Sequence, residues 1–222
     1  PYSSLNARMT ISDIIAEPLK LHKLCANAAE REQRVNELME TVGLSQRLVN
    51  SYPHELDGGR RQRVGIARAL ALNPSFIVCD EPVSALDVSI QAQILNLMQD
   101  LQEQMDLTYI FITHNLSVVN HLADEIAVMY LGQIVEKAPA VELFEQPQHP
   151  YTKALLSAIP VPSLKKKREI QPLTGEISSP IDPPNACRFA PRCPMASARC
   201  TQGIPTLKDV GGGHQVACFL YE

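Results

Sequence analysis

The sequence lacks the features that binding to nucleic acids or crossing a membrane requires. It contains no tryptophan, its aromatic content is 5%, and its formal net charge is −4. Proteins bind bases with stacked aromatic side chains and phosphate backbones with a basic surface, so no nucleic-acid partner is expected. The sequence also has no apolar run of about 18 residues, which a membrane-spanning helix requires, and no signal peptide at its start. We therefore expect a soluble, intracellular protein.

Short apolar runs alternate with a helical pattern in the middle of the chain. Residues 76–79 (FIVC) and 109–113 (YIFIT) are typical of buried strands, and the pattern at 88–105 between them is helical. Strand–helix–strand alternation predicts an α/β fold with a parallel sheet. Residues 125–130 and 133–138 are expected to form two further strands around a tight turn.

The remainder of the chain has a helical start and an irregular end. Apolar residues recur at helical spacing across 10–50, and residues 60–72 form a further helix. Prolines and the basic run KKKR follow residue 160, which is typical of a hydrated linker. We expect three parts: a helical subdomain at 1–72, part of a catalytic core at 73–159, and a linker with a cysteine-rich module at 160–222.

Acidic and histidine side chains stand where the two predicted parallel strands end. Asp80 and Glu81 follow the first strand, and His114 follows the second. In parallel sheets, chemistry takes place beyond the carboxyl ends of the strands. One carboxylate there can hold Mg²⁺ with nucleotide phosphates, and the next can polarise an attacking water. Each signal is weak alone, because acids and histidines at strand ends often serve only as caps or structural hydrogen-bond partners.

A pair of glycines opens the helix expected at 60–72. Gly58 and Gly59 offer bare backbone N–H groups at a helix N-terminus, where the helix dipole favours an anion. Asp57 stands immediately before them, and its negative charge would repel an anion. The turn therefore combines a feature that attracts phosphate with one that opposes it.

The order and spacing of these motifs resemble the ATP-binding subunits of ABC transporters over nearly the whole chain. ELDGGRRQR stands at that family's signature loop, FIVCDEP at the Walker B segment, SALD at the D-loop and THNLSVV at the switch-histidine loop. YPHEL, DEPVSALDVSIQAQ and QHPYTKALLSAIP resemble the oligopeptide/dipeptide importer branch, as does the cysteine-bearing tail. The resemblance implies a partial ABC-type P-loop fold and an ATPase that drives peptide import.

The resemblance also implies roles for individual residues. Asp80 would hold Mg²⁺, Glu81 would orient or deprotonate the hydrolytic water, and His114 would contact the γ-phosphate of ATP. Two such subunits would sandwich two ATP molecules, so that each site is shared between them. The residues expected at the shared seam are Asp57, Gly58, Gly59, Arg60, Ser84 and Asp87.

Two residues of the signature loop depart from the family pattern. The family has serine and glutamine where this chain has Asp57 and Arg60, and an ionised aspartate cannot donate a hydrogen bond to phosphate. One explanation is that Asp57 pairs with Arg60 or Arg61 and caps the helix, which leaves the glycines to bind. The other is that the shared site using this loop is catalytically weak.

A phosphate-cradling G-x-x-x-x-G-K-[ST] motif is absent from the sequence, which has no Gly-Lys pair at all. The first residues, PYSSLN, resemble the segment just after the family's Q-loop glutamine. We therefore interpret the chain as truncated at its N-terminus. We expect this polypeptide alone to bind ATP weakly or not at all, and to hydrolyse none.

Four of the six cysteines lie close to the end of the chain: Cys187, Cys193, Cys200 and Cys218. In an intracellular protein such a cluster indicates a metal site before disulfides. The spacing C-x5-C-x6-C-x17-C suits a zinc ribbon poorly, and the resemblance favours a [4Fe–4S] cluster. Zinc and an unmetallated loop remain alternatives.

The resemblance implies a set of partners and a location. The partners are a second ATPase subunit, either a paralogue or a copy, two transmembrane permease subunits and, indirectly, an extracytoplasmic peptide-binding protein. The location is the cytoplasmic face of the cell membrane, where the subunit would be peripheral. Two rival readings are a soluble ABC ATPase without a transporter and a non-catalytic interaction fragment.

Overall fold

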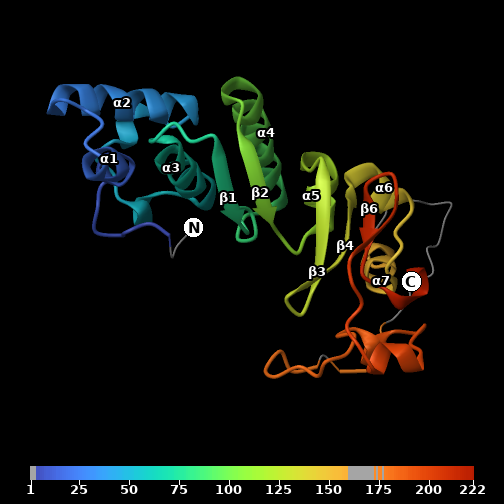
Figure 1. The fold of residues 1–222 in the computed structure, drawn as a ribbon. Helices are drawn as coiled ribbons and strands as arrows, with labels where there is room; N and C mark the ends of the chain where they lie inside the picture. Colours follow the sequence, from blue (N-terminus) through green and yellow to red (C-terminus); the bar gives the residue numbers. More distant parts are fainter. Residues whose placement is uncertain (1–3, 160–172, 174, 177) are drawn as a thin grey trace. The chain divides into compact units, whose positions relative to one another are not determined.

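The computed structural model of the chain falls into two compact units, Pro1–His114 and Asn115–Glu222 (Figure 1). It describes residues 4–159, 173, 175–176 and 178–222. The basic run KKKR and most of the expected linker lie outside these residues, and the three-part division made from the sequence stays a prediction. No helix in the described part of the chain has the length and apolar character needed to cross a membrane.

Three helices form the first part of unit 1: α1 (Ile11–Leu21), α2 (Ala28–Thr41) and α3 (Gly58–Leu70). Their starts follow capping rules, because the side chains of Thr10 and Asn27 each accept a hydrogen bond from a backbone N–H in the first turn. The helices pack around an apolar core. Two short 3-10 turns, η1 (Gln46–Leu48) and η2 (Pro53–Glu55), lead into α3. The helical subdomain expected from apolar spacing is therefore present.

Two parallel strands complete unit 1: β1 (Phe76–Asp80) and β2 (Thr108–Ile112). Helix α4 (Val88–Met105) connects them and lies along one face of the pair (Figure 1). The hydroxyl of Tyr109 on β2 donates to the carbonyl oxygen of Met98 on α4, at 3.2 Å. This strand–helix–strand arrangement confirms the parallel pairing predicted from the sequence.

The prediction that both strands are buried is wrong for one face of the pair. Alternate residues on that face are between 48% and 56% exposed, namely Phe76, Val78, Ile110 and Ile112. Successive side chains of a strand point to opposite faces, and α4 covers only one of them. The apolar run therefore predicted the strands correctly but did not reveal that one face has no covering layer among the described residues of unit 1.

Unit 2 is built on an antiparallel sheet with the strand order β3-β4-β6-β5. Strands β3 (Glu125–Tyr130) and β4 (Gln133–Pro139) form the expected hairpin. Leu131 and Gly132 in its turn both have positive φ angles, 45° and 78°, as a tight hairpin turn requires. Three helices accompany the sheet: α5 (Leu116–Leu122), α6 (Ala140–Glu145) and α7 (Pro150–Ser157).

The cysteine-bearing tail contributes two strands that the sequence did not predict. Strand β6 (His214–Val216) pairs with β4, and β5 (Lys208–Gly211) pairs with β6. The rest of the tail consists of loops and the 3-10 turns η3 (Ala190–Arg192), η4 (Ala198–Thr201) and η5 (Phe219–Tyr221). The tail therefore joins the sheet of unit 2 and is not only an irregular loop.

Candidate functional site

The fold brings Glu81 and His114 into direct contact at the ends of the two parallel strands. Asp80 is in register with Ile112, so the residues that follow each strand emerge side by side. The backbone N–H of Glu81 donates to the carbonyl oxygen of Ile112 at 2.9 Å. Beyond the strands, Oε1 of Glu81 lies 2.9 Å from Nδ1 of His114. The two catalytic candidates predicted from the sequence therefore form a hydrogen-bonded pair.

Glu81 has an unusual backbone and an ionised side chain. Its φ angle is 45°, in the left-handed region that favours glycine, and such strain is concentrated at functional sites. Ser84, another predicted site residue, donates its hydroxyl to the backbone oxygen of Glu81 at 3.1 Å. The hydrogen bond from His114 lowers the pKa of Glu81. Glu81 is therefore a carboxylate at neutral pH, as a proton acceptor must be.

Asp80 lies next to this pair, at the carboxyl end of β1. Its side chain is exposed to solvent, so its carboxylate can be reached by a hydrated cation. Oxygen ligands of this kind are the ones Mg²⁺ prefers. The geometry is compatible with the predicted magnesium role without testing it.

The signature turn is built around Asp57, which is the N-cap of α3. Its Oδ1 accepts a hydrogen bond from the backbone N–H of Arg60 at 2.8 Å, and its Oδ2 lies 3.4 Å from Nε of Arg60. Arg61 instead turns inward and donates to the carbonyl oxygens of Leu56 and Pro53. The structure thus has the Asp57–Arg60 pairing and the helix cap of the first explanation.

The two glycines of this turn pack closely against side chains of unit 1. A Cβ atom on Gly58 would lie 2.9 Å from Cδ2 of Leu86, and one on Gly59 would lie 2.7 Å from Cγ2 of Ile90. Real Cβ contacts are essentially never this short. Asp87, next to Leu86, caps α4 by accepting a hydrogen bond from the N–H of Ile90 at 3.0 Å. The signature turn therefore packs directly against the SALD segment, a contact that sequence analysis missed.

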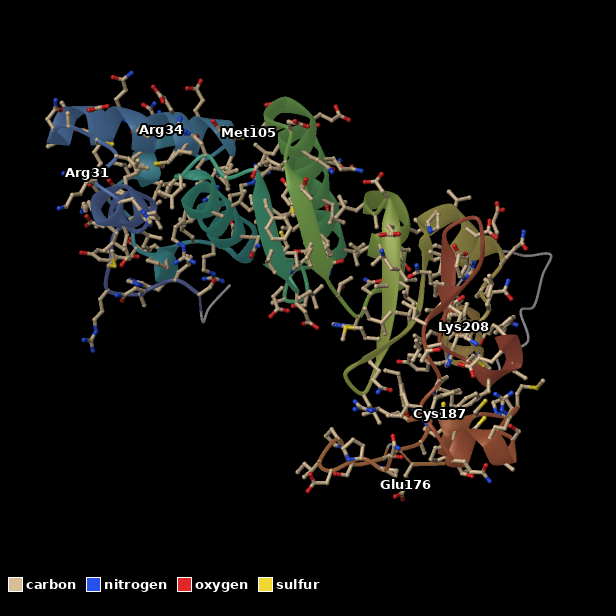
Figure 2. All side chains as sticks on the ribbon, viewed as in Figure 1. Arg31, Arg34, Met105, Glu176, Cys187 and Lys208 are labelled. Atoms are coloured by element: carbon tan, nitrogen blue, oxygen red, sulfur yellow. The ribbon has the colours of Figure 1, made fainter. Side chains whose placement is uncertain are left out.

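The four cysteines of the tail converge on one small cavity of about 40 Å³ in unit 2. Figure 2 shows Cys187 with other sulfur atoms near it. The backbone N–H of Cys187 donates to the carbonyl oxygen of Cys200 at 2.9 Å. Burial raises the pKa of Cys187, Cys193 and Cys218, so these thiols stay protonated unless a cation stabilises the thiolates.

The arrangement of these thiols bears on which metal group would fit. Among the described residues, no group of three or more His, Cys, Asp or Glu is placed to hold a metal ion. A single zinc ion draws four sulfurs to about 2.3 Å, whereas the several irons of a cluster hold their thiolates farther apart. The four thiols thus line one shared cavity, and the [4Fe–4S] cluster expected from the sequence stays a prediction.

A buried network around Glu136 was not predicted from the sequence. The Glu136 carboxyl accepts hydrogen bonds from the backbone N–H groups of Gln148, at 2.6 Å, and His149, at 3.0 Å. It also lies 2.7 Å from Nε2 of His214. All three side chains of this Glu–His–His group are at most 2% exposed. Glu136 and His214 are 78 residues apart, so no local motif could have indicated their contact.

His149 in this network is held in its neutral form. Its Nδ1 accepts a hydrogen bond from the backbone N–H of Tyr151 at 3.1 Å, which places its ring proton on Nε2. Burial lowers the pKa of His149 to about 4. The QHPYT segment thus caps α7 with one histidine and fastens its backbone to Glu136.

Comparisons with known proteins match both units. A family model described as ABC transporter matches residues 2–84, and one described as oligopeptide/dipeptide transporter, C-terminal region, matches residues 135–200. The chain is 52% identical to the putative oligopeptide transport ATP-binding protein YkfD of Bacillus subtilis, covering 100% of this chain and 68% of that protein. It is also 52% identical to the dipeptide transport ATP-binding protein DppF of Haemophilus influenzae, over 99% and 67% of the two chains.

A solved structure is similar as well. The dimeric ABC transporter cassette MJ0796 is 31% identical, with a TM-score of 0.55 over 62% of this chain and 59% of that one. This likeness confirms the predicted α/β class, a partial ABC-type parallel sheet with a helical subdomain.

Proposed function

This chain belongs to the ATP-binding proteins of oligopeptide/dipeptide ABC transporters, and on that premise we propose how its residues energise peptide import. The observation that carries the proposal is the hydrogen bond between Glu81 and His114 at the ends of neighbouring parallel strands. It joins a carboxylate that can accept a proton to a histidine that can contact a phosphate. Such a pair at this edge of an α/β sheet suits phosphoryl transfer to water.

The three residues at this edge have separate roles. Asp80 holds Mg²⁺, which offsets negative charge on the phosphates when it is bound. Glu81 accepts a proton from the attacking water, because its carboxylate is ionised and exposed. His114 holds the Glu81 carboxylate in place and contacts the γ-phosphate of ATP, so loss of that phosphate changes its contacts.

The second ATPase subunit supplies the other half of each ATP site. Gly58 and Gly59 present the N-terminus of α3 to ATP held by that subunit, and Ser84 and Asp87 lie at the seam. The contact of the signature turn with Leu86 and Ile90 supports this role, because it makes the two segments move together. The second subunit is a paralogue or a second copy.

The assembled importer contains further partners. Two transmembrane permeases receive the motion of the ATPase pair, and an extracytoplasmic peptide-binding protein delivers cargo without contacting this chain. The subunit works as a peripheral protein at the cytoplasmic face of the membrane. This 222-residue chain alone, which has no G-x-x-x-x-G-K-[ST] motif, is expected to hydrolyse no ATP, and calorimetric detection of micromolar Mg-ATP binding would contradict that expectation.

The test of the proposed function is Glu81→Gln in the assembled transporter with its partner subunits. Loss of the proton acceptor should lower ATP hydrolysis at this site and peptide uptake by roughly 10²-fold or more. Glu103→Gln, an exposed carboxylate on α4, is the matched control and should leave both rates unchanged. Undiminished uptake after Glu81→Gln would contradict the proposal, and failure to co-purify with permeases would favour a soluble ATPase.

We further propose that the four tail cysteines hold a [4Fe–4S] cluster with a structural or redox-sensing role. The convergence of all four side chains on one cavity supports it. Anaerobic expression should give a brown protein that absorbs broadly near roughly 400 nm. Cys200→Ser should remove this colour and Cys25→Ser should not. A colourless protein with stoichiometric zinc would overturn the assignment.

A further inference from the structure

His149 stands in the wall of the four-cysteine cavity of unit 2, and the cluster proposal gives it no role. It lines this cavity of about 40 Å³ together with Cys187, Cys193, Cys200 and Cys218. It is 1% exposed, and within the described part of the chain its Nε2 atom forms no hydrogen bond. Buried polar groups of proteins almost always have hydrogen-bond partners. The wall therefore presents a polar group whose partner would be held inside the cavity.

Three contacts fix the position and the tautomer of His149. Its backbone N–H donates to Oε2 of Glu136 at 3.0 Å, and its Nδ1 accepts a hydrogen bond from the backbone N–H of Tyr151 at 3.1 Å. Its ring packs against the ring of Phe189, with the two centroids 5.6 Å apart. Because Nδ1 is an acceptor, the ring proton lies on Nε2, at the other edge of the ring. In this tautomer Nε2 is a hydrogen-bond donor and not a metal ligand.

Backbone N–H groups already donate to each of the four sulfur atoms around the cavity. The donors, each at most three residues away in the sequence, are Phe189 and Ala190 for Cys187, Met195 for Cys193, Ser197 for Cys200, and Leu220 for Cys218. Hydrogen bonds to sulfur favour the thiolate over the neutral thiol. The surroundings of the cavity are therefore suited to negative charge on sulfur, and a further donor in the wall acts in the same direction.

We propose that His149 donates a hydrogen bond from Nε2–H to a sulfur atom of the cluster held by the four cysteines, and so raises the reduction potential of that cluster. The inference rests on the proposed function, because it concerns the [4Fe–4S] cluster proposed above. Hydrogen bonds to the sulfurs favour the state of a cluster that carries more negative charge, which is the reduced state. The QHPYT segment then contributes to the site from outside the cysteine-bearing tail.

The buried carboxyl group of Glu136 holds this donor and one of the cysteines in the same framework. It accepts the backbone N–H of His149 and also lies 2.7 Å from Nε2 of His214. His214 opens strand β6, which ends at Val216, and Cys218 follows two residues later. Glu136 therefore fastens both the segment that carries the donor and the strand that leads to a sulfur. Such support keeps a hydrogen-bond donor in place before its acceptor binds.

The test compares two substitutions that each keep one of the two nitrogen functions of His149. His149→Asn places an acceptor oxygen near the position of Nδ1, so it keeps the cap of helix α7 and removes the donor. His149→Gln reaches the position of Nε2 with an amide N–H, so it keeps the donor and gives up the cap. His22→Asn, the same change at an exposed position, is the matched control.

Each variant of the chain is expressed anaerobically, and its iron content, its midpoint reduction potential and its rate of iron loss to a chelator are measured. His149→Asn should keep its iron, but its potential should fall below that of the unchanged protein and it should lose iron roughly tenfold faster. His149→Gln should return both quantities towards those of the unchanged protein. His22→Asn should alter neither.

The outcomes separate failure of this inference from failure of the cluster assignment. Equal potentials in the unchanged protein and His149→Asn, or in His149→Asn and His149→Gln, would overturn the inference alone. Loss of iron from both His149 variants would also overturn it, because the histidine would then serve only the fold. If the unchanged protein contains no iron, the cluster assignment fails and the inference fails with it. If that protein is brown and Cys200→Ser removes the colour, the assignment stands whatever the His149 variants show.

Discussion

The two units each contain a glutamate hydrogen-bonded to a histidine, in opposite surroundings. In unit 1, Glu81 and His114 meet at 2.9 Å with side chains 46% and 74% exposed. In unit 2, Glu136 and His214 meet at 2.7 Å with side chains 0% and 2% exposed. The same chemical pair thus stands open to solvent in one unit and is sealed in the other.

The comparison shows that solvent exposure decides whether such a Glu–His pair can meet a substrate or instead stabilises the fold. The exposed pair contributes little to stability, since water competes for both partners, but substrate can reach it. The buried pair excludes substrate, and breaking it leaves polar groups without partners, which is strongly destabilising. This contrast supports the proposed catalytic role of Glu81 and His114, whereas Glu136 joins β4, β6 and the QHPYT segment.

Removing the buried carboxylate of Glu136 should lower the stability of the protein more than the other substitutions below. Glu136→Gln replaces an acceptor of three hydrogen bonds by a group that also carries two donors, so one N–H faces another. The free energy of unit 2 opening should fall by about 3 kcal/mol. Hydrogen exchange of the β4 and β6 amides measures it.

The control for this prediction is an exposed pair on the same sheet. Glu125 lies 2.8 Å from Lys137, with side chains 52% and 37% exposed. Glu125→Gln should change the opening free energy by less than about 1 kcal/mol. Equal effects of the two substitutions would break the comparison, because burial would then not matter.

Acid should destabilise unit 2 through His149. Its pKa is about 4 when folded, against an ordinary value of 6.5, so the unfolded chain binds more protons between these values. Stability is therefore lost as pH falls from about 6.5 to about 4, by up to about 3 kcal/mol. Denaturant unfolding across this range measures the slope. His149→Asn should flatten it and His22→Asn, at an exposed position, should not; a slope unchanged in His149→Asn would refute the assignment.

In unit 1, the stability of the fold should depend on close packing at Gly59, a position without charge. Gly59→Ala places a Cβ 2.7 Å from Cγ2 of Ile90, and overpacking of this kind costs about 1–3 kcal/mol. Ile90→Ala removes that methyl group, so it should relieve most of the cost in a double-mutant cycle of unfolding free energies.

Gly65 on the same helix is the matched control. A Cβ there meets nothing within 4 Å, and alanine is the better helix former by about 1 kcal/mol. Gly65→Ala should therefore stabilise α3. If Gly59→Ala did the same, the packing reason for the signature glycine would be wrong.

The smallest expected effect is a change in pKa at the exposed pair. The hydrogen bond from His114 lowers the pKa of Glu81, so His114→Ala should move it back up towards the usual value of 4.5. A carboxyl-carbon NMR titration measures the midpoint. No shift after His114→Ala would show that the two side chains do not interact in solution.

The sequence predicted the local elements of this fold better than their surroundings. Apolar spacing predicted the helices within 10–50, at 60–72 and at 88–105, although it did not predict α6 and α7. The runs FIVC and YIFIT predicted β1 and β2, because these signals lie within short segments. It did not predict the exposure of Val78 and Ile112, since burial depends on which other segments cover a face. Strands β5 and β6 were missed because KDVG and HQV are too short to show alternation.

The candidate site followed the same rule. The sequence predicted that Glu81 and His114 lie near each other, because the carboxyl ends of parallel strands share one edge of the sheet. The cap formed by Asp57 was one of two alternatives left open by the sequence, since it involves a residue three positions away. Glu136 and His214 could not be paired, because only the long-range pairing of β4 with β6 joins them.

Glu81 occupies a backbone conformation, with φ at 45°, that suits glycine or asparagine better than glutamate. The residue that is best for stability at this position therefore differs from the residue that is best for activity. A library screened for survival of heating should accumulate glycine or asparagine there, whereas a library screened for growth on peptides should return glutamate. Directed evolution of a hardier importer subunit should accordingly hold position 81 fixed.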